Sequence, residues 1–182
     1  MSSALGTIVK DAIEMSVRGY IPGISFDSRS LPYMNKVLYS NIYSIYLRCC
    51  IAAERGDVDS ITKLLSIIGP KDGSVNQLNS SGLSPLHIAT KQGHSNVILA
   101  LSQHPKFDIN GLCKDGYAAL HLAVKHRKVK CVKMLLDRGA NLNVLDVGGK
   151  TALHMAARKA NIEIVKIIMK QPNVNVCIEG QG

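Results

Sequence analysis

One six-residue motif constrains this chain more than any other feature, because it occurs three times at a nearly fixed interval. It begins at Ser84 as Ser-Pro-Leu-His-Ile-Ala and returns in altered form at Ala118 and Thr151, 34 and then 33 residues further on. A period of about 33 residues indicates that the chain stacks copies of one small unit. Such an array offers an extended surface to a partner, so we expect binding rather than catalysis.

The composition favours helices as the repeated element. Hydrophobic residues make up 46% of the 182 residues, whereas aromatic residues make up 4% and tryptophan is absent. The core must therefore be aliphatic, which suits closely packed helices better than a β-sandwich. No apolar run approaches the ~18–20 residues of a membrane span, and the N-terminus is too polar for a signal-peptide core. We expect a soluble protein.

The cysteines show no disulfide or zinc spacing. They are five in number, and no Cys-x-x-Cys pair occurs among Cys49, Cys50, Cys113, Cys131 and Cys177. We expect reduced thiols in a cytosolic compartment, mostly buried as small hydrophobic residues. The histidines do not supply the close ligand pairs that zinc needs, so we expect neither a metal site nor a cofactor.

Each unit opens with a predicted turn and a short first helix. The fourth turn residue is a glycine, which permits the positive φ of a tight hairpin: Gly82, Gly116 and Gly149. Ser84 and Thr151 stand where a helix N-cap is wanted, and Pro85 stands at the first helical position. The first helix then runs through Leu-His-x-Ala.

A second helix and a short closing segment complete each unit. Apolar residues recur at helical spacing over residues 97–101, 129–136 and 162–168. Gly139 is well placed to stop the helix before it. We expect a small extended run to end each unit, around Asn110, Asn143 and Asn175.

A degenerate copy precedes these three. Residues 51–58 match residues 88–95, with Cys49-Cys50 in place of Leu-His. Its second helix is predicted from Ser60 to Ile68, and an inserted loop over residues 69–74 follows. The predicted units are therefore about 44–78, 79–112, 113–145 and 146–182. The last stops where another turn would begin, and we expect the chain to be part of a longer protein.

Residues 1–43 follow no repeat. We expect a helical extension that caps the first unit, including a helix from Tyr33 to Leu47 with Tyr39, Tyr43 and Tyr46 on one face. The alternative is a separate helix that binds a partner or a membrane surface.

The repeated residues closely resemble the ankyrin repeat: a turn with Gly, Thr-Pro-Leu-His-x-Ala, a helix, and Leu-Leu-x-x-Gly-Ala-x-x-Asn. The resemblance covers about residues 45–182. It implies an all-α solenoid of stacked helix pairs with hairpins projecting at right angles. It also implies a non-enzymatic module whose partners bind the concave face formed by hairpin tips and first helices.

Two departures from the family pattern carry structural expectations. Ala118-Ala119 replaces Thr-Pro, so His121 should lose the hydroxyl that family histidines bond, and the third unit should be less stable. Arg127 and Ala160 occupy the position where Gly56 and Gly93 end the first helix, so those turns should be strained or shaped differently.

The repeated histidines are predicted to be structural. His87, His121 and His154 recur once per unit, and stacked helices about 10 Å thick would keep them too far apart to share a metal or a proton. No nucleophile motif, phosphate-binding loop or paired-carboxylate site is present. We therefore expect no catalytic residues.

The candidate binding residues lie at the end of the first helix and at the hairpin tips. Positive charge recurs there at the repeat period, in Lys91, Lys125 and Arg158. We predict a basic groove for an acidic protein segment, although lysine is also a common choice at any exposed position. The predicted partner-binding residues are Arg55, Ser81, Leu83, Lys91, Gln92, Lys114, Asp115, Tyr117, Lys125, His126, Lys150, Arg158 and Lys159.

Three functions follow from this pattern. The first is a cytoplasmic adaptor or scaffold that binds another protein, with no small-molecule substrate. The second is the targeting or substrate-recognition arm of a larger protein, namely an enzyme, a channel or a secreted effector. A secreted effector would act in the cytosol of a host cell. The third is binding of nucleic acid or anionic lipid, suggested by the net charge of +9 and the basic run over residues 125–130. Tyr117 is the only aromatic residue near that run, whereas binding of single-stranded nucleic acid generally uses several aromatic side chains that stack on bases. The same run also allows a nuclear location.

Overall fold

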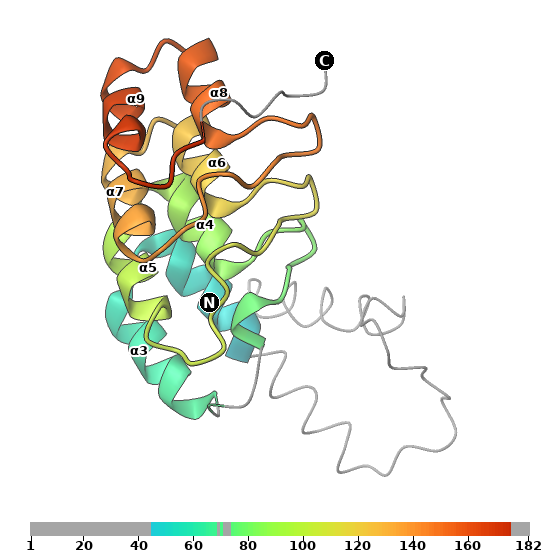
Figure 1. The fold of residues 1–182 in the computed structure, drawn as a ribbon. Coiled ribbons are helices and arrows are strands. Elements are labelled where there is room, and N and C mark those ends of the chain that lie inside the picture. The colour runs from blue at the N-terminus through green and yellow to red at the C-terminus, as the bar shows by residue number, and fades with distance from the viewer. Residues whose placement is uncertain (1–44, 69, 71–73, 176–182) are drawn as a thin grey trace.

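The computed structural model describes residues 45–68, 70 and 74–175. In this part the chain stacks helix pairs along one axis, and hairpin loops project from one side of the stack (Figure 1). The first unit consists of a helix over residues 45–55, α3 (Val58–Ile67) and the short 3-10 helix η1 (Ser74–Asn76). The predictions for residues 1–43 lie outside the described residues. Of the predicted helix from Tyr33 to Leu47, only residues 45–47 are described, and they are part of the helix over residues 45–55.

The three later units have the same helix–turn–helix plan. Their helices are α4 (Pro85–Gln92), α5 (Ser95–Leu101), α6 (Ala119–Lys125), α7 (Val129–Asp137), α8 (Ala152–Arg158) and α9 (Ile162–Met169). The first helices form one row, in which α4 packs on α6 and α6 on α8, and the second helices α3, α5, α7 and α9 form the other. The predicted all-α repeat solenoid is confirmed.

The core lies between the two rows and is aliphatic, as expected. Its members include small alanines of the first helices, where neighbouring backbones approach closely, and fully buried side chains of the second helices such as Ile98 and Leu135. The four described cysteines, Cys49, Cys50, Cys113 and Cys131, are free and buried. Burial raises the pKa of Cys50 to about 12 and that of Cys49 and Cys131 to about 11. They behave as small hydrophobic residues.

The repeated histidine both caps its own helix and joins the next unit. His87 Nδ1 accepts the backbone N–H of Ser84 at 3.3 Å and lies 2.7 Å from the Ser84 hydroxyl oxygen. Because Nδ1 accepts a backbone N–H, the neutral ring carries its proton on Nε2 and donates to the carbonyl of Tyr117 at 3.2 Å. Burial of His87 lowers its pKa, which favours this neutral form. The structural role predicted for this histidine is confirmed.

The third unit shows the predicted loss of one cap bond. His121 Nδ1 still accepts from the Ala118 N–H at 3.2 Å, and its Nε2 donates to the Lys150 carbonyl at 3.1 Å. Alanine has no oxygen to offer, whereas the Thr151 hydroxyl in the fourth unit lies 2.8 Å from His154 Nδ1. The link between units therefore survives and only the local cap is weaker.

The turns that end the first helices require a left-handed residue. Gly56 and Gly93 adopt φ of +75° and +99°, and the residues in the same position of the next units, Arg127 and Ala160, adopt 54° and 50°. A side chain in this conformation costs free energy that glycine does not pay. Arg127 and Ala160 therefore keep the left-handed turn of the earlier units, so of the two predicted alternatives a strained turn applies and a differently shaped one does not.

The prediction of extended runs is wrong for Asn110 and Asn143, whereas the residues that follow Asn175 lie outside the described part of the chain. Residues 109–110 and 142–143 are turns, because Asp108 and Asn141 each accept the backbone N–H two residues later at 2.9 Å. The asparagines instead join units: Asn110 Oδ1 accepts the N–H of Asn141 at 2.8 Å, and Asn143 Oδ1 accepts that of Asn175 at 3.2 Å. Local side-chain bonding therefore competes successfully with extended structure.

Relief of the strained turn should stabilise the array. Replacing Ala160 by glycine should raise the free energy of unfolding by about 1 kcal/mol, because the φ of 50° then carries no steric cost. Urea denaturation measures the change. The matched control is Ala157→Gly, an exposed position inside α8, which should instead lower stability by about 0.5–1 kcal/mol. Equal destabilisation by both changes would contradict strain at Ala160.

Restoring the missing cap should also stabilise the chain. Ala118→Ser places a hydroxyl beside His121 Nδ1 and should add about 1 kcal/mol. Thr151→Ala is the reciprocal change and should remove a similar amount, since the Thr151 hydroxyl makes the corresponding bond. Thermal unfolding followed by circular dichroism compares both variants with the parent chain; a serine without effect would contradict the cap assignment.

Candidate protein-interaction surface

The predicted ladder of positive charge lies at the carboxyl ends of the first helices. Lys91, Lys125 and Arg158 each stand in the last turn of α4, α6 and α8, and all three are exposed. Carbonyl groups at a helix end carry partial negative charge, so a cation here is locally favourable. We call the surface formed by these helix ends and the hairpin arms the concave face.

The structure gathers several cations around His126. The charges that act on its ring belong to Lys91, Lys125, Lys128 and Lys159, and so come from three successive units. The pKa of His126 is lowered, first by burial and then by these four lysines. We call His126 and the four lysines the cationic cluster. No interaction that joins them to a carboxylate occurs within the described ranges.

Bonds between units hold part of the cationic cluster in place. Lys159 Nζ donates to the carbonyl of Lys125 at 3.1 Å and thereby satisfies one carbonyl at the end of α6. Arg127 Nη2 donates in turn to the carbonyl of Lys159 at 3.5 Å. His94 makes a corresponding link to the first unit, with Nε2 3.1 Å from the Glu54 carbonyl oxygen.

Tyr117 connects the hairpin of the third unit to the charges. Lys125 Nζ lies 4.5 Å from the centroid of the Tyr117 ring, a cation–π geometry. The Tyr117 carbonyl is the acceptor for His87, and the Lys150 carbonyl is the acceptor for His121. The repeated histidines therefore fix the backbone at two predicted site residues.

The hairpin tips stack in register. The Lys114 N–H donates to the Gly82 carbonyl at 2.9 Å. Gly82 must be a glycine, since a Cβ there would lie 2.2 Å from Lys114 Cβ and its φ is +73°. Ser81 and Asp115 are exposed at the same tips, whereas Leu83 packs against the core and is only partly accessible.

Not every predicted residue belongs to the cationic cluster. Arg55, Gln92 and Arg158 are exposed at the ends of their helices, but none of them is among the charges that act on His126. The basic run over residues 125–130 crosses from α6 into α7, as predicted. Of the residues of this run that follow His126, only Lys128 is among the charges that lower the pKa of His126.

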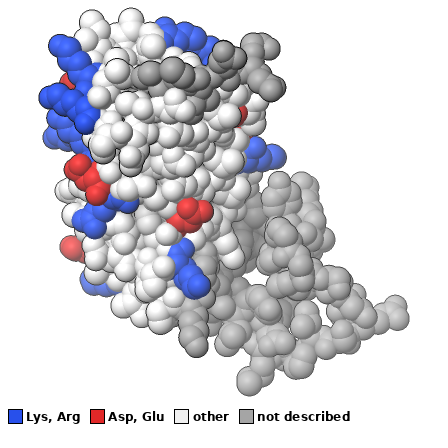
Figure 2. All heavy atoms as spheres, in the orientation of Figure 1, with Lys and Arg blue, Asp and Glu red and all other residues white. Residues whose placement is uncertain are grey.

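Positive charge also occurs on the opposite side of the stack. In Figure 2, Lys and Arg gather along the left edge, where the second helices lie. Exposed Lys130 and Lys133 of α7 and Lys166 of α9 belong to this outer face. The basic character is therefore shared between two faces, and these outer lysines provide matched controls.

Sequence reasoning missed three exposed leucines on the hairpins. Leu78, Leu112 and Leu145 expose 39%, 48% and 43% of their surface. They recur at intervals of 34 and 33 residues, each immediately before a hairpin turn. The signal that could have found them is the repeat period applied to apolar residues outside the helices.

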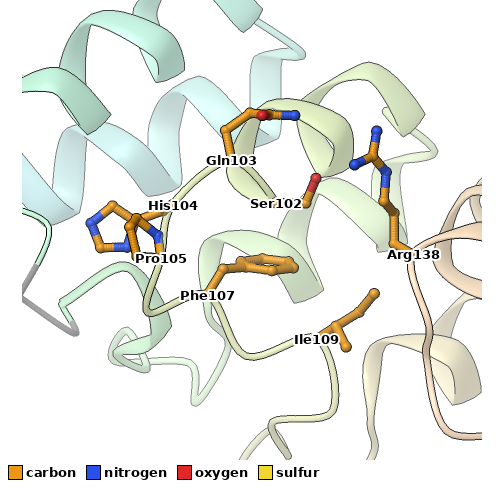
Figure 3. Close-up of a pocket in the computed structure, with 7 residues that line it drawn as sticks. All are labelled: Ser102, Gln103, His104, Pro105, Phe107, Ile109 and Arg138. Atoms are coloured by element: carbon orange, nitrogen blue, oxygen red, sulfur yellow. The ribbon is translucent and has the colours of Figure 1, made fainter.

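A hollow of about 410 Å³ lies near the loop after α5, but the polar side chains that line it do not point toward a common ligand position. Figure 3 shows His104 and Pro105 directed away from Phe107 and Ile109, and the Arg138 guanidinium pointing away from Ile109. The Ser102 hydroxyl is already bonded to the Leu99 carbonyl at 2.7 Å. We place no binding site there.

Metal-ligating side chains do not cluster in threes within residues 45–68, 70 and 74–175. The same ranges contain no helix of the length and apolarity needed to cross a membrane.

Comparison with known proteins identifies the repeat. A family model described as ankyrin repeats, in three copies, matches residues 49–146, and a single ankyrin repeat model matches residues 148–180. Cortactin-binding protein 2 of Ornithorhynchus anatinus is 34% identical over 95 residues, which are 51% of this chain and 5% of that protein. The probable 26S proteasome regulatory subunit p28 of Saccharomyces cerevisiae is 33% identical over 69 residues, 37% of this chain and 30% of that subunit.

A third relative is the nuclear factor NF-kappa-B p105 subunit of Rattus norvegicus, 28% identical over 106 residues, 57% of this chain and 10% of that subunit. This chain thus spans less than a third of the length of each of these relatives. The family models, in contrast, match most of the chain in the register of the stacked units described above. The chain belongs to the ankyrin repeat family.

Proposed function

We propose that this chain is an adaptor or scaffold module that holds an acidic segment of a partner protein on its concave face. The observation that carries the proposal is the cationic cluster: lysines from three successive units lie near enough to His126 to lower its pKa, and Lys159 reaches across to the Lys125 carbonyl. Like charges repel, and within the described part of the chain no carboxylate pairs with these four lysines, so an anion bound near them would be stabilised.

The helix ends alone do not account for this much charge. Each helix carboxyl end carries about half a negative charge, so α4, α6 and α8 together offer roughly −1.5. The cluster holds four lysines. The excess remains available to a ligand, and two successive carboxylates of an acidic segment would neutralise most of it.

The names of relatives support a protein as the partner. One relative is named for binding cortactin, and another is named as a probable regulatory subunit of the 26S proteasome. These names describe proteins that bind or assemble with other proteins. An interaction role without enzymatic activity is therefore the proposal that agrees best with the family.

A recognition arm of a larger protein is the second candidate. Two of the relatives place the matching repeats in much longer chains: the matched part is 5% of cortactin-binding protein 2 and 10% of the NF-kappa-B p105 subunit. In such a protein the concave face would select the target and another region would act on it. The four buried free thiols suit a cytoplasmic location in either case.

Reversing charge on the concave face should strongly weaken the binding of an acidic ligand. We expect the triple variant Lys91→Glu, Lys125→Glu, Arg158→Glu to bind a fluorescein-labelled peptide of alternating Glu and Ser at least tenfold more weakly than the parent chain. Fluorescence anisotropy measures the affinity, and circular dichroism checks that the helices remain.

The matched control carries the same charge change on the outer face, as Lys130→Glu, Lys133→Glu, Lys166→Glu. It should keep the affinity within about twofold, because these side chains lie on the second helices. Equal losses in both triples would show that net charge, not the concave face, determines binding. Titrations with duplex DNA and with phosphatidylserine vesicles at 150 mM salt test the remaining alternative; either ligand binding more tightly than the peptide would reject a protein partner.

Binding should also depend on pH through His126. Its pKa is lowered in the free chain, by burial and by four lysines. Carboxylates of a bound segment would raise it, so binding takes up a proton and weakens as pH rises from the free pKa through the bound pKa. We expect affinity to fall several-fold between pH 6 and pH 8, measured by anisotropy at constant ionic strength.

The His126→Gln variant should bind with little pH dependence over the same range, because the imidazole that takes up the proton is gone. Every other histidine is kept, so the comparison isolates His126. If the variant keeps the full slope, another group takes up the proton and His126 is not part of the ligand site.

A further inference from the structure

Three large apolar side chains are exposed at equivalent positions on successive hairpins. Leu78, Leu112 and Leu145 expose between 39% and 48% of their surface, whereas core leucines such as Leu101 and Leu135 expose none. Full burial of a leucine side chain is worth about 1.5–3 kcal/mol, so covering the exposed part of each would add roughly 1 kcal/mol to binding. We call these three residues the leucine ladder.

The hairpins hold the leucine ladder in line along the stack. The first turn residue of each hairpin donates its N–H across the arm at 2.9 Å, from Asn79 to Leu83, from Cys113 to Tyr117 and from Asp146 to Lys150. Each ladder leucine directly precedes one of these donors. Equivalent positions on equivalent hairpins therefore lie one above another, separated by the thickness of one unit.

The leucine ladder adjoins the charged part of the concave face. Leu112 forms an antiparallel bridge with Ala118, the residue that follows Tyr117. Lys125 lies over the Tyr117 ring at 4.5 Å. A segment laid across the hairpin arms can thus contact apolar side chains while its carboxylates approach the lysines.

The thickness of one unit limits what can fit. Helices packed side by side are about 8–10 Å apart. A polyproline II segment returns to the same side every third residue, after about 9.3 Å. A β-strand returns after two residues, about 6.8 Å, and an α-helix returns to nearly the same side after seven residues, about 10.5 Å. The polyproline II spacing falls within the interval between units, and it needs only a single file of contacts.

We propose that the leucine ladder binds a polyproline II segment of the partner that carries an apolar side chain at every third residue, with acidic residues between. The proposal rests on the proposed function of the concave face and specifies the sequence of the acidic segment that fits it. Charge complementarity with the cationic cluster selects the acidic residues, and the three leucines select their spacing.

Labelled peptides of fixed composition test the spacing. The matched peptide is three repeats of Leu-Glu-Pro, and the shuffled peptide has the same residues with its leucines adjacent. The parent chain should bind the matched peptide at least tenfold more tightly, as measured by fluorescence anisotropy. Equal binding of the two would overturn the leucine ladder and leave the acidic-segment function intact, whereas binding of neither would reject the function itself.

Variants of the chain test whether the three leucines cause the preference for the matched peptide. Leu78→Ser, Leu112→Ser, Leu145→Ser together should reduce binding of the matched peptide to the level of the shuffled one. The control changes exposed apolar residues elsewhere, Ile67→Ser and Ile162→Ser, which expose 62% and 68%, and should preserve the preference. Tighter binding of a helical peptide with leucines seven residues apart would also overturn the polyproline II assignment.

Discussion

The hydrogen bond from a repeated histidine to the next unit is the interaction on which this array depends. His87 reaches the Tyr117 carbonyl and His121 reaches the Lys150 carbonyl, while the other ring nitrogen of each accepts from its own helix N-cap. One neutral side chain thus fixes the start of a helix and the position of the following hairpin. Burial lowers the pKa of both histidines and keeps them in the neutral form that this requires.

The same bond connects the invariant part of the repeat to its variable part. Tyr117 and Lys150 occupy the same position in successive units, and their backbone is held while their side chains differ. Tyr117 then supports Lys125, and Lys159 of the following unit donates to the Lys125 carbonyl. The charges of the concave face are therefore placed by the stacking of units, so that a change in unit registry would move them.

Much of the fold could be predicted because the repeat states its structural requirements directly. Before Leu-His, a glycine predicts a turn, a serine predicts an N-cap and a proline predicts the first helical residue. Aligning the units in the same register also predicted unusual turns at Arg127 and Ala160. The asparagine loops could not be predicted in this way, since Asp108 and Asn141 form local turns that compete with extended structure. The gathering of lysines around His126 depends on contacts between units, which a single unit's sequence does not contain.

Some surface residues form hydrogen bonds between neighbouring units, and others do not. Lys159 and Arg127 have partners in neighbouring units, whereas Lys91 and the exposed parts of the leucine ladder have no contact of this kind within the described residues. Residues of the second kind are the ones on which a preference for one partner over another can depend, because they can change without disturbing the histidine bonds.

The most direct measurement of the central claim is a nuclear magnetic resonance titration of the isotopically labelled chain with the alternating Glu-Ser peptide. A ligand on the concave face shifts the amide signals of Lys91, Tyr117, Lys125, His126 and Lys159 and leaves those of Lys130, Lys133 and Lys166 unchanged. Shifts centred on the outer lysines, or spread evenly over both faces, would contradict an acidic-segment site on the concave face.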